Sequence, residues 1–254
     1  MHSLSNKVAI VTGASSGIGR ATALLFAQQG AAVVLAARRQ AELDALVSEI
    51  GSAGGRAVAL AGDVADERVA QALVELAISR FGGLDIAVNN AGTMGQPGAV
   101  PDMPLDEWNQ VMATNLTSAF LAAKYQLPAL EARGGGSLMF VGTFVGYTAG
   151  MPGMAAYAAS KAGLIGLTQV LAVEYGARRV RVNALLPGGT DTPMGRAFAN
   201  TPEILAFVQN LHALKRLAQP EEIAQAALFL ASDASSFVTG TTLLADGGVS
   251  INHV

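Results

Sequence analysis

Short apolar runs rich in valine, isoleucine and leucine recur along the chain. Seven of them lie at residues 8–11, 33–35, 58–60, 86–88, 138–141, 180–186 and 242–244. The stretches between the runs are mostly rich in alanine and leucine and are long enough for helices. Strands that alternate with helices are typical of a parallel sheet, and strands that are apolar at nearly every position indicate burial on both faces. The pattern predicts an α/β fold with a parallel sheet of about seven strands and helices on both faces.

Nothing in the chain marks a boundary between domains. No Pro/Ser-rich linker, charge block, internal repeat or change of composition interrupts the 254 residues. We therefore expect a single domain over residues 1–254. Because crossover connections between parallel strands are right-handed, a doubly wound open sheet is favoured, with ligands bound beyond the carboxyl ends of its strands.

Composition excludes several classes of function. The chain has 16 Lys+Arg against 19 Asp+Glu and shows no basic patch, so we expect no nucleic-acid partner. It has no cysteine, which excludes disulfides, thiolate catalysis and cysteine-bound zinc and suits a reducing cytoplasm. His2, His212 and His253 lack a spaced set of partner ligands, so we expect no catalytic metal.

Hydropathy gives no sign of a membrane protein. The mean hydropathy is +0.40, but the apolar runs end well before the roughly 18 residues that a membrane span requires. The first residues show no basic stretch followed by an apolar region and a small-residue cleavage site. We expect no membrane span, no secretory signal and a cytoplasmic location.

A glycine-rich segment follows the first apolar run. It reads Thr12-Gly13-Ala14-Ser15-Ser16-Gly17-Ile18-Gly19-Arg20 and leads into a helical stretch at 21–29. Glycine permits a sharp strand-to-helix turn and lets backbone N–H groups and the helix N-terminus approach a pyrophosphate. The spacing is G-x-x-x-G-x-G rather than G-x-G-x-x-G. The segment could be a turn without a ligand, but its place in the first strand-to-helix connection favours dinucleotide binding.

The same residues also satisfy G-x-S-x-G, the motif around the nucleophile of many serine hydrolases, with Ser15 as the nucleophile. A triad could be completed by Asp191 or Asp246 together with His212 or His253. Such a motif normally follows earlier strands that supply part of the oxyanion hole, whereas only 14 residues precede Ser15. The hydrolase is therefore the less favoured alternative.

Two arginines, Arg38 and Arg39, follow the second run, where a carboxylate would bind the free ribose hydroxyls of NAD. Two guanidiniums suit bidentate contacts with a 2′-phosphate instead. They could also cap a helix or face water. We expect NADP rather than NAD as the cofactor.

Tyr157 and Lys161 lie four residues apart in a predicted helix of small residues and so share a face. An ammonium near a phenol stabilises the phenolate and is expected to lower the phenol pKa by roughly 1–3 units, which suits a general acid–base. Tyrosine and lysine at this spacing are also common as an ordinary half-exposed pair.

These motifs together resemble those of the short-chain dehydrogenase/reductase family over nearly the whole chain. The matching segments are Thr12-Gly13-x-x-x-Gly17-Ile18-Gly19 (cofactor turn), Asn89-Asn90-Ala91-Gly92 (the segment after the fourth strand), Asn115 (catalytic asparagine), Tyr157-x-x-x-Lys161 (catalytic pair) and Pro187-Gly188-Gly189-Thr190-Asp191-Thr192 (nicotinamide contact). The resemblance implies a Rossmann-like fold and hydride transfer between NADP(H) and a carbonyl or alcohol substrate.

The resemblance also implies a role for each matching residue. Tyr157 would act as general acid–base on the substrate oxygen, Lys161 would hold the nicotinamide ribose and acidify the tyrosine, and Asn115 would support a proton-relay water. Asp63 and Val64 would hold the adenine. The expected cofactor-binding residues are Gly13, Ser15, Ser16, Gly17, Ile18, Gly19, Arg38, Arg39, Asp63, Val64, Asn90, Ala91, Gly92, Tyr157, Lys161, Pro187, Gly188, Thr190 and Thr192.

The chain departs from the family at its catalytic serine, where Thr143 stands when the apolar strand end is aligned. Threonine keeps the hydroxyl, but its methyl group restricts χ1 and crowds the site. The segment from Thr143 to Tyr157 is about one residue longer than the family leads us to expect, so Thr148 is an alternative, and Thr143 could simply bond the backbone. A catalytically impaired NADP-binding sensor or scaffold is therefore the alternative to an enzyme.

By the same resemblance, residues 188–212 would cover the substrate, and Asp246-Gly247-Gly248 would belong to a closing strand and turn where subunits meet. A homo-oligomer, expected to be a tetramer, is implied. The apolar side chains that could line a pocket, or could equally belong to a core or interface, are Phe144, Tyr147, Met151, Met154, Met194, Phe198 and Phe207. These residues do not identify the substrate, because one fold serves many substrates.

Overall fold

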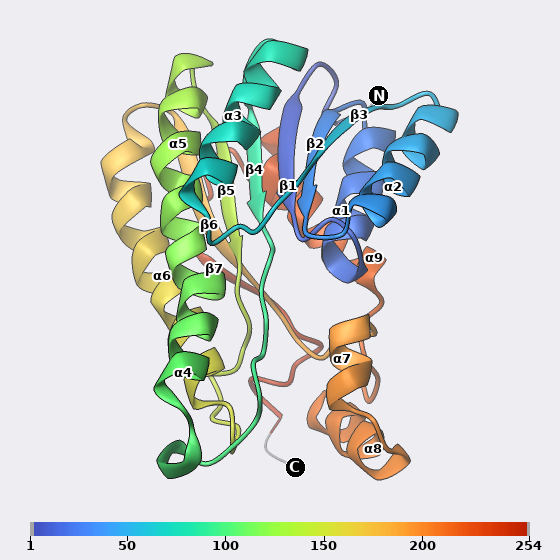
Figure 1. Ribbon diagram of the computed structural model, residues 1–254, viewed down its shortest axis with the longest axis vertical. Helices are drawn as coiled ribbons and strands as arrows, with labels where there is room; N and C mark the ends of the chain where they lie inside the picture. Colours follow the sequence, from blue (N-terminus) through green and yellow to red (C-terminus); the bar gives the residue numbers. More distant parts are fainter. Residues whose placement is uncertain (1–2, 253–254) are drawn as a thin grey trace.

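The seven apolar runs are the strands of one parallel sheet in the computed structural model, which describes residues 3–252 (Figure 1). The strands are β1 (Val8–Thr12), β2 (Ala32–Ala37), β3 (Arg56–Ala61), β4 (Ile86–Asn89), β5 (Gly136–Val141), β6 (Val180–Pro187) and β7 (Thr242–Ala245). They pair in the order β3-β2-β1-β4-β5-β6-β7, and every pair is parallel. The prediction of a single α/β, doubly wound sheet is confirmed.

Helices cover both faces of this sheet (Figure 1). They are α1 (Gly17–Gln28), α2 (Gln40–Ser52), α3 (Glu67–Phe81), α4 (Leu105–Met112), α5 (Ser118–Ala132), α6 (Ala155–Gly176), α7 (Pro193–Phe198), α8 (Pro202–Leu211) and α9 (Pro220–Ala231), with short 3-10 turns at Val100–Asp102 and Asp233–Ser235. Helices α1, α2 and α9 pack on one face, and α3, α5 and α6 pack on the other.

The apolar character of each strand follows from this double cover. In β2, Val33 and Leu35 belong to the cluster that contains Phe26 of α1, whereas Val34 belongs to the cluster that contains Leu73 of α3. Successive side chains of a strand point to opposite faces, so a strand buried on both sides needs an apolar residue at every position.

Helix α6 is the one helix in the described part of the chain that is long and apolar enough to cross a membrane by length and composition. In this structure its inner side packs on the sheet, where Leu164 and Leu171 join the same apolar cluster as Phe140 of β5. Helix α6 is therefore a core helix of the domain.

Helices α7 and α8 lie apart from these two layers, below the carboxyl end of the sheet and across from α4 (Figure 1). Both come from the segment that the sequence assigned to covering the substrate. Their threonine N-caps, Thr192 and Thr201, accept hydrogen bonds from the backbone N–H groups of Gly195 and Ile204. Each short helix therefore has a defined start.

Candidate active site

A cavity of about 800 Å³ lies beyond the carboxyl ends of the strands. The segments that follow β1, β2, β3, β4, β5 and β6 all contribute to its lining. Of the predicted site residues, all but Gly19 and Asn115 line it. The fold therefore places the sequence motifs around one space, at the edge where doubly wound sheets bind ligands.

The glycine-rich turn is packed too closely to accept side chains. Gly13 and Gly17 have φ of 67° and 54°, in the left-handed region. A Cβ on Gly13 would lie 2.7 Å from the Asn90 side-chain nitrogen, and one on Gly19 would overlap the carbonyl oxygen of Gly13. Gly19 therefore supports the turn from behind, while the backbone and the start of α1 remain accessible from the cavity. This arrangement fits a pyrophosphate.

Thr12 ties this turn to the neighbouring strand end. Its hydroxyl oxygen accepts hydrogen bonds from the backbone N–H groups of Asn90 and Ala91, both at 3.0 Å. The Asn90 side chain donates back to the carbonyl oxygen of Thr12 at 3.0 Å. The segments after β1 and β4 are thus held together where they face the cavity.

The two arginines after β2 have different surroundings. Arg39 donates to the hydroxyl oxygen of Ser15 at 3.0 Å and forms an ion pair with Glu42 at 3.0 Å. Arg38 lines the cavity and makes no hydrogen bond or ion pair with another of the residues 3–252. Arg38 is therefore the cation that is free to bind a phosphate, whereas Arg39 braces the glycine turn.

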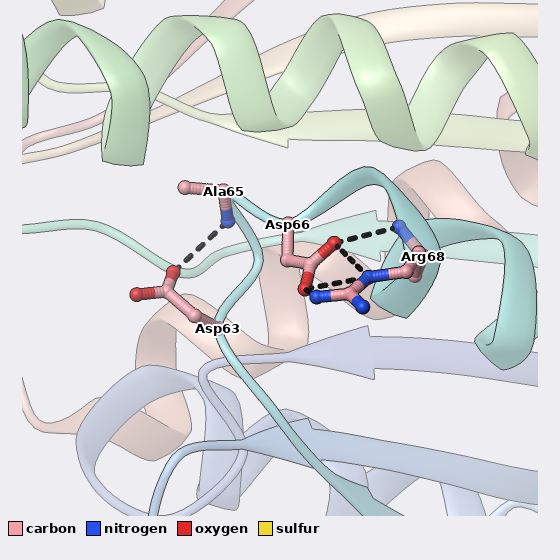
Figure 2. Close-up of polar contacts among 4 residues, drawn as sticks. All are labelled: Asp63, Ala65, Asp66 and Arg68. Atoms are coloured by element: carbon pink, nitrogen blue, oxygen red, sulfur yellow. Dashed lines mark hydrogen bonds and ion pairs between the residues drawn. The ribbon is translucent and has the colours of Figure 1, made fainter.

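Asp63, which follows β3, uses only one of its two carboxylate oxygens in a recorded hydrogen bond. Figure 2 shows its Oδ1 directed at the backbone N–H of Ala65, at 2.9 Å, with the other oxygen pointing away. Within the described chain, no hydrogen bond uses that second oxygen, which can accept from an amino group. The next carboxylate, Asp66, is engaged with Arg68 and caps α3.

Tyr157, near the start of α6, lies next to Thr143, and both residues line the cavity. Burial raises the pKa of the Tyr157 phenol, and a hydrogen bond from the Thr143 hydroxyl acts in the opposite direction but is the smaller effect. The other candidate hydroxyl, Thr148, lies outside the cavity lining and contacts Ser250 at 2.6 Å. The structure therefore brings Thr143, and not Thr148, to the phenol.

Lys161 lies one helical turn after Tyr157 and is 5% exposed. Its ammonium donates to the carbonyl oxygen of Val141 at 2.8 Å, and burial lowers its pKa to about 8. That Lys161 acidifies the phenol stays a prediction, because the recorded causes of the Tyr157 pKa shift are burial and the Thr143 hydrogen bond and do not include Lys161. The burial that raises the Tyr157 pKa is the larger effect, and the nearest recorded partner of Lys161 is a backbone carbonyl.

Asn115 sits behind the cavity in a single π-helical turn, Ala113–Thr117, that joins α4 to α5. Its side-chain oxygen accepts from the N–H of Thr93 at 2.8 Å, and its amide donates to the Thr93 carbonyl and the Ser160 hydroxyl at 2.8 and 2.9 Å. A Cβ on Gly92 would lie 3.1 Å from both Asn115 Oδ1 and Lys161 Nζ. Asn115 therefore adjoins Lys161, as the sequence motifs suggested.

Sequence reasoning missed Ser160 and the structural role of His212. Ser160 donates to the carbonyl oxygen of Tyr157 at 2.8 Å and accepts from Asn115, so it links the predicted tyrosine and asparagine. Its place next to Lys161 was the available signal. His212 accepts the N–H of Gly189 at 2.9 Å and therefore donates from Nδ1 to the Val208 carbonyl at 2.8 Å. These two hydrogen bonds link the end of α8 to the segment after β6. Nothing local in the sequence indicated that role.

One end of the cavity is apolar. The Tyr157 ring packs with a cluster that includes Phe144, Met154 and Phe198. Of the apolar side chains considered from the sequence, Phe144, Met151, Met154, Met194 and Phe198 line the cavity, whereas Tyr147 and Phe207 do not. Tyr147 hydrogen-bonds Thr242 at 3.1 Å, and Phe207 is 56% exposed.

Among residues 3–252, the structure assembles no hydrolase triad around Ser15. The Ser15 hydroxyl bonds Arg39, and both ring nitrogens of His212 bond backbone groups. Asp191 pairs with Arg196 at 2.6 Å, and Asp246 accepts from the N–H groups of Gly248 and Ser250. His253 and His2 lie outside the described residues.

Comparisons with known proteins agree with this geometry. A family model described as enoyl-(acyl carrier protein) reductase matches residues 13–250. Cyclohexanol dehydrogenase of an Acinetobacter species is 39% identical over 246 residues, covering 97% of this chain and 96% of the relative.

Two solved structures match over nearly the full length. A 7α-hydroxysteroid dehydrogenase complexed with NADH and 7-oxo glycochenodeoxycholic acid is 36% identical, with a TM-score of 0.91, and the match covers 96% of this chain and 94% of that one. A structure from Beutenbergia cavernae with bound NADP is 37% identical, with a TM-score of 0.92 and 99% of both chains covered.

Proposed function

Because the chain belongs to the short-chain dehydrogenase/reductase family and is an NAD(P)-dependent oxidoreductase of alcohols and carbonyls, we propose that it uses NADP(H) and that Tyr157 is its general acid–base. One observation carries the proposal. Thr143, Tyr157 and Lys161 converge at one end of a cavity whose other end presents the glycine turn, Arg38 and Asp63.

The residues of the cavity fit a dinucleotide. The backbone of the glycine turn would hold the pyrophosphate, the free oxygen of Asp63 would accept from the adenine amino group, and Arg38 would bind a 2′-phosphate. Lys161 would hold the nicotinamide ribose. The segment with Pro187 and Thr190, which lines the cavity after β6, would contact the nicotinamide. When bound, the reduced cofactor supplies a hydride to the carbonyl carbon.

The proton chemistry falls to this chain's own side chains. In the reduction, Tyr157 donates its phenolic proton to the substrate oxygen, and the Thr143 hydroxyl holds that oxygen by a hydrogen bond. The raised pKa of Tyr157 keeps the phenol protonated at neutral pH, which is the form that a reduction needs. Asn115, through its contact with Ser160, would position a water that relays protons toward Lys161.

Thr143 supplies the hydroxyl whose loss motivated the sensor or scaffold alternative. Thr143 lies beside Tyr157. The whole residue, with its extra methyl group, is only 8% exposed and is therefore packed into the site. No feature of the described residues favours a protein that binds NADP without chemistry, so the enzyme is the function that the geometry supports.

We propose that residues 1–254 form a single domain. Within it, residues 188–212 would cover the substrate. Met194, Phe198, Val208 and Leu211 of this segment line the cavity. The hydrogen bonds of His212 to both Gly189 and Val208 would hold the segment over the apolar end.

We also propose that the protein is a homotetramer in the cytoplasm. Large apolar side chains are exposed at Phe120 of α5 and Val173 of α6, at 54% and 85%, and at Phe237 and Ile251 later in the chain, at 103% and 76%. Burial of such exposed apolar side chains between identical subunits would suit a symmetric assembly.

The substitution Tyr157→Phe tests the proposed acid–base. It removes the phenolic proton while keeping the ring, so kcat for carbonyl reduction should fall by about 10²–10⁴-fold. The dissociation constant of NADPH, measured by its fluorescence on binding, should change by less than about threefold. The matched control is Tyr147→Phe, because Tyr147 lies outside the cavity lining. It should keep kcat near that of the native protein. Retained turnover in Tyr157→Phe would remove Tyr157 as the proton donor.

A further inference from the structure

The distribution of charge around the cavity is uneven. Its charged lining residues are Arg38, Arg39, Asp63 and Lys161. The proposed function assigns three of them to the cofactor or to catalysis, and Arg39 braces the glycine turn through Ser15. Among the described lining residues, the end beyond Tyr157 has no charged side chain. Its wall is made by Met94, Phe144, Met151, Met154, Phe198 and Leu211, which pack with the Tyr157 ring in one apolar cluster.

The cations nearest in sequence to this end are already engaged elsewhere. Arg196, in α7, pairs with Asp191 at 2.6 Å. Lys215 donates to the carbonyl oxygen of Asn210 at 2.9 Å, and Arg216 forms two hydrogen bonds with Glu222 at 2.7 Å each. None of these three cations lines the cavity.

A carboxylate lies against residues 95–96, which directly follow the lining residue Met94. Glu107 accepts the N–H of Gln96 at 2.7 Å, and a Cβ on Gly95 would lie 2.6 Å from the same carboxylate oxygen. The charged side chain recorded next to this part of the lining is therefore negative and not a counter-ion for an anion. An anionic substrate at this end would be buried against methionine and phenylalanine side chains, with no cation among the described residues of that wall, which strongly disfavours a charged group.

We propose that this site takes uncharged, apolar ketones and secondary alcohols and rejects those that carry a carboxylate or phosphate near the reacting carbon. The inference rests on the proposed function, since it assigns the apolar end to the substrate. The inference narrows the proposed substrates from alcohols and carbonyl compounds in general to the uncharged, apolar ones.

The first test compares kcat/KM for three ketones with NADPH: 4-methylcyclohexanone, 4-oxocyclohexanecarboxylate and the methyl ester of that acid. The anion should be reduced with a kcat/KM at least about 100-fold below that of the methyl ketone. The ester is larger than the acid but neutral, and it should stay within about tenfold of the methyl ketone. Comparable kcat/KM values for the anion and the methyl ketone would overturn the inference and leave the proposed function intact.

Binding separates this inference from the proposed function. Cyclohexanecarboxamide and cyclohexanecarboxylate have nearly the same shape, and neither has a ketone to reduce. In calorimetric titrations of the NADPH-loaded protein, the amide should bind at least about tenfold more tightly. That preference without any ketone turnover would overturn only the proposed function. Equal or tighter binding of the carboxylate, or no binding of either compound, would overturn the inference.

A lysine placed in the lining should relax the selectivity. Met194 lines the cavity and is 40% exposed, so the aliphatic part of Met194→Lys can lie along the apolar wall while its ammonium stays hydrated. The ratio of kcat/KM for the anion to that for the methyl ketone should rise at least about tenfold. Ile204→Lys is the matched control, because Ile204 is 36% exposed on α8 and lies outside the lining. It should leave the ratio unchanged, and an equal rise in both variants would contradict the assignment of this wall to the substrate.

Discussion

At the scale of single residues, side chains that look equivalent in sequence make different contacts around the cavity. Arg38 and Arg39 are neighbours of the same type, yet Arg39 is engaged by Ser15 and Glu42, while Arg38 lines the cavity without a described partner. A free guanidinium can make bidentate, charge-assisted hydrogen bonds to a phosphate. The proposed preference for NADP therefore depends on Arg38.

Arg38→Ala should raise the dissociation constant of NADPH by about 10–100-fold, because hydrogen bonds to charged groups contribute about 1.5–3 kcal/mol. The dissociation constant of NADH, which lacks the 2′-phosphate, should change by less than about threefold. Both constants can be measured by cofactor fluorescence.

Arg39→Ala is the control for that measurement. Because Arg39 braces the glycine turn through Ser15, its loss should weaken NADPH and NADH by similar factors. An equal loss of both cofactors in Arg38→Ala would show that Arg38 does not bind the 2′-phosphate.

At the scale of elements, two local irregularities position the site. The glycine turn between β1 and α1 brings backbone groups to the cavity, and the π-helical turn between α4 and α5 carries Asn115 to Thr93 and Ser160. Isolated π-helical turns occur frequently at functional sites because they change the direction in which a side chain points. Each irregularity depends on close packing against a neighbouring segment.

Gly19→Ala should destabilise the protein and weaken NADPH binding. The new Cβ would overlap the carbonyl oxygen of Gly13 and lie 2.6 Å from the Asn90 side-chain nitrogen. The start of α1 must then shift away from the turn, at a cost of about 1–3 kcal/mol in the free energy of unfolding. Thermal unfolding and NADPH titration measure the two effects.

Gly51→Ala gives the matched comparison, since Gly51 is also helical. A Cβ there has no described atom within 4 Å, so the substitution should stabilise α2 by about 0.5–1 kcal/mol. If Gly19→Ala proved as stable as Gly51→Ala, the close packing behind the turn would be refuted.

At the scale of the whole molecule, several large apolar side chains of α5 and α6 stay exposed after the domain has folded. Val173 is 85% exposed, and Val170 on the same helix is 55% exposed. Large exposed apolar side chains on neighbouring helices would suit an interaction surface if they form one patch. The apolar composition of α6 thus reflects its sheet-facing side together with this proposed subunit interface.

Val173→Glu should convert the proposed tetramer into smaller species, because it buries a charge in the interface. Light scattering coupled to size-exclusion chromatography measures the mass directly. Val173→Ala keeps the surface uncharged and should preserve the larger assembly. A native protein that elutes as a monomer would contradict the proposed tetramer.

The sequence by itself determined the elements and the order of the motifs. Each of the seven apolar runs lies in a strand, because a strand buried on both faces must be apolar along its length. The glycine turn and the spacing of Tyr157 and Lys161 were equally visible, since both depend on residues close together in the chain.

Only the tertiary structure decided which of these groups are free, paired or buried. The distinction between Arg38 and Arg39, the bonds of His212 to Gly189 and the upward shift of the Tyr157 pKa all depend on neighbours from other segments. The uncharged wall around Phe144 likewise assembles from distant segments, namely Met94, residues 144–154, Phe198 and Leu211. Strand and helix patterns arise from local spacing, whereas burial and charge pairing depend on contacts that exist only after the chain has folded.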